Sequence, residues 1–299
     1  MPELPEVEVT RRSFAERIAG ARVLDVRLGA PLRWPLGCAP AKLVGRTVGL
    51  ATRRGKYLWL PLADPGSAES QAAGGLLMHL GMSGSLAFAD RGPVAAPSKH
   101  DHFDLVTSRG LLRLTDPRRF GAVVWSSALD VPPAATLLAR LGAEPFDESL
   151  TPLRFHAALK ARRSAVKTAL LAGDIVVGAG NIYACEALYA AGIDPRTRCN
   201  RISRPRAERL LAAVRTTLAR ALELGGSSLR DFSRCARRRR RLPARGARLR
   251  PCRAGLRALF RRASSHRSGA AFDLFLPELP KTLSESQARI DSCDKLHAL

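Results

Sequence analysis

The chain has 299 residues, 46% of them apolar, which is enough for one large domain or two ordinary ones with a sizeable core. These values exclude a collagen and a wholly disordered chain. Lysine and arginine number 49 against 26 aspartates and glutamates, so the net charge is +23 and the isoelectric point is about 11.3. Such a charge indicates a polyanionic partner, with nucleic acid the first candidate and an anionic membrane surface the second.

The positive charge is concentrated toward the C-terminal end. Residues 1–233 hold 32 basic and 21 acidic side chains, net +11, whereas residues 234–299 hold 17 and 5, net +12. From composition alone, the second segment is interpreted as a disordered basic tail that binds phosphate groups.

The cellular location follows from what the sequence lacks. It contains no run of about 18 apolar residues, so no membrane span is predicted. The N-terminus has no apolar signal segment, and we expect a cytoplasmic protein. The six cysteines form no C-x-x-C pair, which favours isolated reduced thiols over a disulfide framework or a zinc ribbon.

The predicted elements change from strands to helices along the chain. Apolar residues at helical spacing predict a helix over residues 6–19, after Pro5. Short alternating or apolar runs, typical of an antiparallel sandwich, then predict strands at 22–28, 46–51, 56–62, 75–80, 102–107, 111–114 and 121–126.

Helical periodicity begins after Pro132-Pro133. Helices are predicted at 134–141, 152–161, 164–172, 181–191 and 204–224. Ser203 is the expected N-cap of the last helix, and Gly225-Gly226 are expected to end it. The fold class is therefore α+β, with a β-sandwich domain at 1–130, a helical domain at 131–233 and a basic tail at 234–299.

The N-terminus offers nucleophilic chemistry. Removal of Met1 would expose Pro2 as a secondary amine, and an α-amino group has a pKa of about 8, so part of it is neutral at physiological pH. Such an amine can attack a sugar C1′ and form an iminium, and Glu3 can transfer the proton. The purely structural alternative is that Pro opens the helix and Glu favours its N-terminal dipole.

Two further patterns have local interpretations. His100 and His102 form an H-x-H pattern, which places both imidazoles on one face of a strand and leaves a metal hydrolase as an alternative function. Gly178 and Gly180 allow close backbone approach, and Asn181 is the predicted cap of a helix whose exposed N–H groups can hold a phosphate.

Six ordered motifs carry a resemblance to a known family. They are M-P-E-L-P-E-V-E (1–8), R-R-G-K-Y-L (53–58), H-L-G-M-S-G-S-L (79–86), K-H-D-H-F-D-L (99–105), T-D-P-R-R-F-G (115–121) and V-G-A-G-N-I-Y (177–183). In this order they resemble the formamidopyrimidine-DNA glycosylases, bifunctional enzymes that excise oxidised purines and then cleave the abasic strand. The resemblance extends to residue 233. The related endonuclease VIII enzymes are a distant second, because they typically have Gly where this chain has Leu4.

The resemblance implies a role for each matching residue. Pro2 would be the Schiff-base nucleophile, Glu3 the proton donor in base release and Lys56 the proton donor in β-elimination. The side chains that enter the base stack would be Met82, Arg118 and Phe120. The further DNA contacts would be His100, Arg162, Lys167 and Asn181, the last two belonging with Arg162 to a helix-two-turn-helix domain. The implied partner is damaged double-stranded DNA, bound by a monomer.

The C-terminal segment departs from the family pattern. The family carries one structural zinc ion on a finger of pattern C-x2-C-x16-C-x2-C, and those four cysteine ligands are absent here. If the codons are read one nucleotide downstream, suitable leucine codons become cysteine codons at that spacing, namely those of Leu256, Leu259, Leu276 and Leu279. We therefore hypothesise that translation is out of frame from a point between residues 234 and 256. Loss of the finger is expected to impair the activity, and a non-catalytic basic DNA-binding protein is the alternative function.

Overall fold

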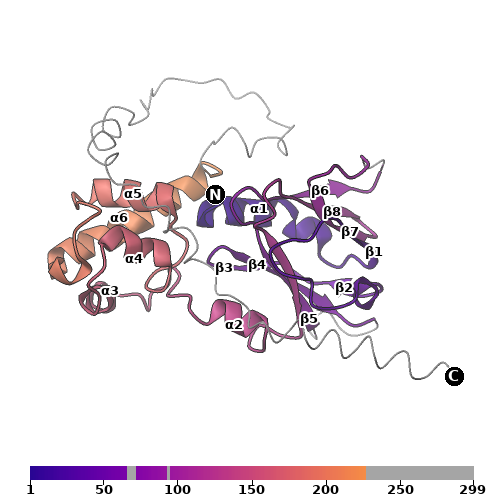
Figure 1. Cartoon of the computed structure of the whole chain (residues 1–299), viewed down its shortest axis with the longest axis horizontal. Helices are drawn as coiled ribbons and strands as arrows, with labels where there is room; N and C mark the ends of the chain where they lie inside the picture. The colour runs from indigo at the N-terminus through magenta and orange to yellow at the C-terminus, as the bar shows by residue number, and fades with distance from the viewer. Residues whose placement is uncertain (66–71, 93–94, 227–299) are drawn as a thin grey trace, which may run out of the picture. The chain divides into compact units, whose positions relative to one another are not determined.

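The first helix shows how the N-terminal segment folds. The computed structural model describes residues 1–65, 72–92 and 95–226, and helix α1 spans Leu4–Ile18 (Figure 1). It begins earlier than the predicted residue 6 because Pro5 lies in the first turn, where no N–H is needed. The predicted tail at 234–299, with its frame hypothesis, lies outside the described residues.

The strands form two antiparallel sheets, which confirms the predicted sandwich. The strands are β1 (Val23–Leu28), β2 (Thr47–Val48), β3 (Thr52–Arg54), β4 (Tyr57–Ala63), β5 (Ala72–His79), β6 (Ser85–Asp90), β7 (Asp101–Thr107), β8 (Gly110–Thr115) and β9 (Ala122–Ser126). One sheet has the order β1-β7-β8-β6, and the other has the order β2-β4-β5-β9 with β3 also paired to β4. A 3-10 turn, η1 (Pro40–Leu43), lies between β1 and β2.

Two details of the sheets differ from the prediction. The predicted strand at 46–51 is reduced to Thr47–Val48, and β3 at Thr52–Arg54 was not predicted. The two strands pair with β4 on either side of Pro61, which has no N–H to donate to the ladder. Strand β6 was not predicted, since Ala87 and Ala89 leave only a weak alternation around Leu86.

The register of the second sheet brings several loops to one end. Tyr57, at the start of β4, pairs with His79 at the end of β5, and His79 pairs with Ala122 at the start of β9. The segments that precede Tyr57, follow His79 and precede Ala122 therefore meet at the same edge of the sandwich. Four of the candidate residues lie in these segments, namely Lys56, Met82, Arg118 and Phe120.

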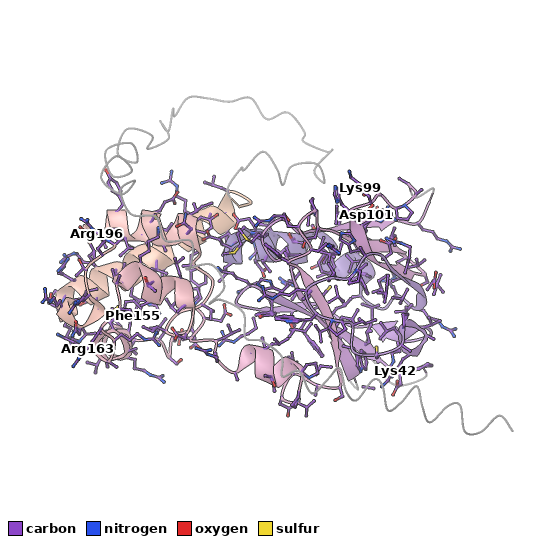
Figure 2. The ribbon with its side chains drawn as sticks, viewed as in Figure 1. Lys42, Lys99, Asp101, Phe155, Arg163 and Arg196 are labelled. Carbon is purple, nitrogen blue, oxygen red and sulfur yellow. The ribbon has the colours of Figure 1, made fainter. Side chains whose placement is uncertain are left out.

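The helical part has its own core. Its helices are α2 (Ala134–Leu138), α3 (Pro152–Lys160), α4 (Val166–Ala172), α5 (Asn181–Ala190) and α6 (Arg204–Glu223), with the 3-10 turn η2 (Cys199–Arg201) before α6. Phe155 of α3, marked in Figure 2, is fully buried in this core, which is separate from the core between the sheets. No helix within the described ranges is long and apolar enough to cross a membrane.

Helix α6 starts and stops as predicted. Ser203 is its N-cap residue, and Gly225 and Gly226 adopt left-handed φ angles of 78° and 88° after its last turn. The N–H of Gly225 donates to Leu222 O, and the N–H of Gly226 donates to Ala221 O at 2.7 Å. This is the Schellman arrangement, which satisfies the last carbonyls of the helix.

Helix α1 should depend on the sandwich core for its position. The Phe14 side chain is fully buried in that core. We expect Phe14→Ala to lower the free energy of unfolding by about 3–5 kcal/mol, the usual range for truncating a buried aromatic ring. Urea titration measures this, with Leu24→Ala as the control because Leu24 is 52% exposed. Equal effects of the two substitutions would contradict this placement of α1.

Candidate active site

The carboxylate of Glu3 is held by the first turn of helix α5. The N–H groups of Gly180, Ile182 and Tyr183 donate to it at 2.5, 2.8 and 3.3 Å, and the side chain is almost wholly buried. The sequence predicted that these N–H groups hold a phosphate and that Asn181 caps the helix. Both predictions are wrong: Gly180 is the N-cap, Asn181 is an exposed first residue, and the chain's own carboxylate occupies the donors.

Two glycines make this contact possible. A Cβ at Gly180 would lie 2.5 Å from the Glu3 Cδ, and a Cβ at Gly178 would lie 2.4 Å from the Leu4 Cδ1. The φ of Gly178 is 96°, and its carbonyl accepts a hydrogen bond from the Leu4 N–H at 3.0 Å. The close backbone approach that the sequence predicted is thus real, but it serves the N-terminal segment of the chain.

Pro2 lies beside this buried carboxylate. Pro2 is buried, whereas Met1 is 43% exposed. The Glu3 N–H donates to Glu6 Oε2 at 2.9 Å, and the Tyr183 hydroxyl donates to Glu6 Oε1 at 2.6 Å. These bonds fix the backbone immediately after Pro2, so the residue is presented in one orientation.

Lys56 shares the electrostatic environment of Glu3. Burial lowers the pKa of Lys56, while the carboxylates of Glu3 and Glu6 oppose that change. Burial also raises the pKa of Glu3, against the effects of Lys56 and of the α5 N–H groups. The two shifts bring the pKa values of this carboxyl and this amine closer together, which favours proton transfer between them.

A carboxylate that the sequence reasoning missed holds the turn that carries Lys56. Glu144 accepts a hydrogen bond from the Gly55 N–H at 2.6 Å and pairs with Arg54 at 3.0 Å and Arg53 at 2.9 Å. Arg53 also pairs with Glu8 of α1 at 3.2 Å. Glu144 lies far from β3 in the sequence, in a segment with no recognisable local signal, so only the fold reveals this support.

The sequence did not single out His79, although it is the first residue of the H-L-G-M-S-G-S-L motif. Its Nδ1 accepts a hydrogen bond from the Gly81 N–H at 3.0 Å, and its ring centroid lies 4.8 Å from that of Tyr57. Burial lowers the pKa of His79 to about 3, helped by the positive charges of Lys56 and Arg33. The imidazole is therefore neutral and carries its proton on Nε2.

The three predicted base-stack residues come together on two adjacent loops. Met82 lies in the turn between β5 and β6, and Arg118 and Phe120 lie in the loop between β8 and β9. Phe120 is 39% exposed, and the Arg118 guanidinium lies 4.7 Å from the centre of its ring. An exposed aromatic ring with a cation stacked on it is suited to contact with bases.

The H-x-H pattern does not form a two-imidazole site. His102 is 4% exposed, and its Nε2 lies 3.1 Å from the Asp116 carbonyl, which makes it a structural residue. His100 lies before β7, between Lys99 and Asp101, which Figure 2 labels, and it is partly exposed. The two rings therefore have different environments.

The basic residues of the helical part differ in their environments. Arg162 pairs with Asp174 at 2.7 Å and is partly buried, whereas Arg163, labelled in Figure 2, is exposed. Lys167 is partly exposed at the start of α4. A phosphate would therefore compete with Asp174 for the Arg162 guanidinium.

The part of the chain that the structure describes contains no set of side chains for a metal ion. Within residues 1–65, 72–92 and 95–226, no three His, Cys, Asp or Glu side chains gather so that they could hold a metal ion. Three cysteines in these ranges are free, namely Cys38, Cys185 and Cys199. The described residues therefore do not fit the family's zinc ion, and Cys235, Cys252 and Cys293 lie outside them.

The neutral His79 makes stability depend on pH. Its pKa falls from an ordinary 6.5 to about 3 on folding, so the unfolded chain binds the extra proton between these values. The contribution to stability is complete above pH 6.5 and is lost as the pH falls, at about 1.4 kcal/mol per pH unit. We expect the unfolding free energy of the parent to fall more steeply below pH 6.5 than that of His79→Gln, in urea titrations at several pH values. Parallel curves would contradict the buried neutral imidazole.

Comparisons with known proteins give the same family for two successive parts of the chain. Residues 1–123 match the sequence model of the formamidopyrimidine-DNA glycosylase N-terminal domain, and residues 141–233 match that of the formamidopyrimidine-DNA glycosylase H2TH domain. The second match ends at residue 233, where the quoted motifs also end. The domain boundaries expected at 130 and 233 stay a prediction.

Individual relatives carry the same name. Formamidopyrimidine-DNA glycosylases from Albidiferax ferrireducens and Variovorax paradoxus are 59% and 60% identical over 233 residues, or 78% of this chain and 82% of theirs. Among solved structures, the Lactococcus lactis enzyme in complex with abasic-site DNA matches with a TM-score of 0.67 and 31% identity, covering 76% of this chain and 80% of that one. A mutant of that enzyme bound to DNA containing Fapy-dG matches with a TM-score of 0.68 and 31% identity, covering 82% and 85%. The chain belongs to the formamidopyrimidine-DNA glycosylase family.

Proposed function

We propose that this chain excises oxidised purines, such as 8-oxoguanine and formamidopyrimidines, from duplex DNA through Pro2, and then cleaves the abasic strand. The observation that carries the proposal is the Glu3 carboxylate, seated on three N–H groups with a raised pKa, directly after Pro2 and beside Lys56. Exposed Met1 can be removed, which leaves Pro2 as a secondary amine.

The reaction uses this chain's own groups. The neutral Pro2 nitrogen attacks C1′, the bond from C1′ to the base breaks, and the electron pair leaves with the base, which takes up a proton. Glu3 supplies the proton that the base takes up. The resulting carboxylate accepts the proton of the Pro2 nitrogen and passes it to O4′, so the C1′–O4′ bond breaks and an iminium between Pro2 and C1′ remains. The iminium acidifies C2′, and loss of that proton breaks the bond between C3′ and its oxygen. Lys56 would stabilise the departing phosphate and donate the proton that the elimination requires.

Contacts to DNA complete the proposal. Met82, Arg118 and Phe120 would fill the space that the damaged nucleotide leaves in the stack. The phosphate contacts would come from His100, Arg162, Lys167 and exposed Asn181. Support comes from the neighbouring structures, which are complexes of the Lactococcus lactis enzyme with damaged DNA. Because chromosomal DNA is the substrate, we expect the protein to act in the cytoplasm.

Family members carry a structural zinc ion, but no step of this mechanism uses it. The alternative of a non-catalytic DNA-binding protein has no support, since the matching relatives are named as glycosylases. The comparisons also do not bear out the impairment expected from loss of the finger. The metal hydrolase has no support either, because His102 bonds to the backbone of Asp116.

Borohydride trapping tests the nucleophile. We expect a reduced covalent complex with duplex DNA that contains 8-oxoguanine, because borohydride reduces an iminium to a stable amine. Mass spectrometry of the trapped peptide should place the sugar remnant on Pro2, with Met1 absent. An adduct on a lysine, or no adduct, would refute the assignment of Pro2.

Replacing Glu3 should separate the two steps. Glu3→Gln keeps the side-chain shape but gives no proton, so base excision should fall by about 10²–10⁴, the usual contribution of a general acid. Trapping on a preformed abasic site should persist, since it needs no base release. Glu16→Gln is the control, because Glu16 is exposed near the other end of α1. Equal loss on both substrates would show that Glu3 acts only structurally.

A further inference from the structure

A buried carboxylate joins the two loops that carry the base-stack residues. Asp116 is fully buried, and its Oδ1 accepts hydrogen bonds from the Ser83 hydroxyl at 2.5 Å and the Arg118 N–H at 3.2 Å. Its Oδ2 accepts from the Gly121 N–H at 2.7 Å. Ser83 follows Met82, whereas Arg118 and Gly121 enclose Phe120, so one side chain connects both loops.

The backbones of the two loops also touch. A Cβ at Gly81 would lie 2.4 Å from the carbonyl carbon of Phe120 and 2.5 Å from the nitrogen of Gly121, and the φ of Gly81 is 62°. Within the described residues, Arg119 is the non-glycine residue with a left-handed φ, 57°, and its N–H donates to the Asp116 carbonyl at 3.2 Å. Such a backbone persists only where its surroundings determine it.

The base of Asp116 is fixed as well. Its N–H donates to the His100 carbonyl at 2.8 Å, and its carbonyl lies 3.1 Å from His102 Nε2. The backbone of Asp116 is therefore held at the end of β8, and its carboxylate accepts hydrogen bonds from both loops.

We propose that Asp116 is the positioning residue for strand insertion, holding Met82 at a set distance from the stacked pair Arg118 and Phe120. This rests on the proposed function, because it assumes that these three side chains enter the duplex. Asp116 itself does not touch DNA. Its role is to keep the two loops together, so that the three side chains enter the stack as one preformed wedge, with little ordering needed on binding.

The chemistry requires a carboxylate at this position. Three donors converge on two acceptor oxygens, and an amide offers one acceptor and one donor group. In Asp116→Asn, an amide NH2 that faces the Gly121 N–H leaves that buried donor without an acceptor. An NH2 that faces Ser83 leaves the Arg118 N–H only its 3.3 Å bond to Ser83 Oγ. The loops should then separate on the side that faces the amide nitrogen.

The test measures insertion without catalysis. The probe is a duplex with an uncleavable tetrahydrofuran abasic analogue next to the fluorescent base 2-aminopurine, whose emission rises when stacking is lost. We expect the equilibrium constant for this rise to fall about tenfold in Asp116→Asn, the effect of losing one hydrogen bond to a charged acceptor. Gly81→Ala pushes the same loops apart without altering the carboxylate, so it should lower this equilibrium constant in the same way. It replaces Asp116→Asn in the test if Asp116→Asn does not fold.

The matched control is a second buried aspartate in the same domain. Asp104 of β7 is 3% exposed and pairs with Arg27 at 2.8 Å and Arg113 at 2.9 Å. Asp104→Asn should lower stability but leave the fluorescence rise unchanged. A similar loss in both aspartate variants, or an unchanged rise in folded Asp116→Asn and Gly81→Ala, would overturn the proposal.

A second readout separates this inference from the Pro2 chemistry. Borohydride trapping on a single-stranded abasic oligonucleotide needs no opening of a stack, so Asp116→Asn should trap like the parent. Loss of trapping in this variant at the parent's fluorescence response would overturn the positioning role. A different result is that the parent gives no trapped complex and still shows a fluorescence rise that Asp116→Asn weakens. That result would overturn Pro2 as the nucleophile and support the role of Asp116.

Discussion

The structure depends most on one interaction, between the Glu3 carboxylate and the N–H groups at the start of α5. Helix N-termini attract anions because their first N–H groups have no partner within the helix and the dipole is positive there. In this chain the anion comes from the third residue. The bond therefore ties the N-terminal segment, which belongs to the sandwich domain, to the helical part. It also places Pro2 next to the group that would transfer its protons.

The register of the second sheet brings together the loops that carry Lys56 and the base-stack residues. Because Tyr57, His79 and Ala122 are paired in a row, the loops beside them meet at one edge. Two carboxylates then fix those loops: the partly buried Glu144 accepts from the turn of Lys56, and the fully buried Asp116 accepts from the loops of the base-stack residues. A carboxylate removed from water is costly unless donors surround it, so the nearby backbone must keep its N–H groups directed at these two side chains.

Sequence reasoning succeeded where the signal is local. Alternation and helical spacing found most strands and helices, and the glycine pair after α6 ended the helix as expected. It failed where a partner lies far along the chain. Asn181 was predicted to cap the helix and leave its N–H groups free, since nothing nearby shows that a residue 179 positions away would accept from them. Pro61 of β4 likewise lies between the residues that pair with β2 and those that pair with β3, so that two short strands form there.

The sequence by itself determined the α+β class, the sandwich followed by helices, the family and the chemistry that a terminal proline offers. These follow from local periodicity and from motifs whose order is specific. Only the tertiary structure decided which donors hold Glu3, which carboxylates support Lys56 and the base-stack loops, and which histidine is neutral and buried. The physical reason is that burial and hydrogen-bond partners are set by packing between distant segments, and no short stretch of sequence contains both partners of such a contact.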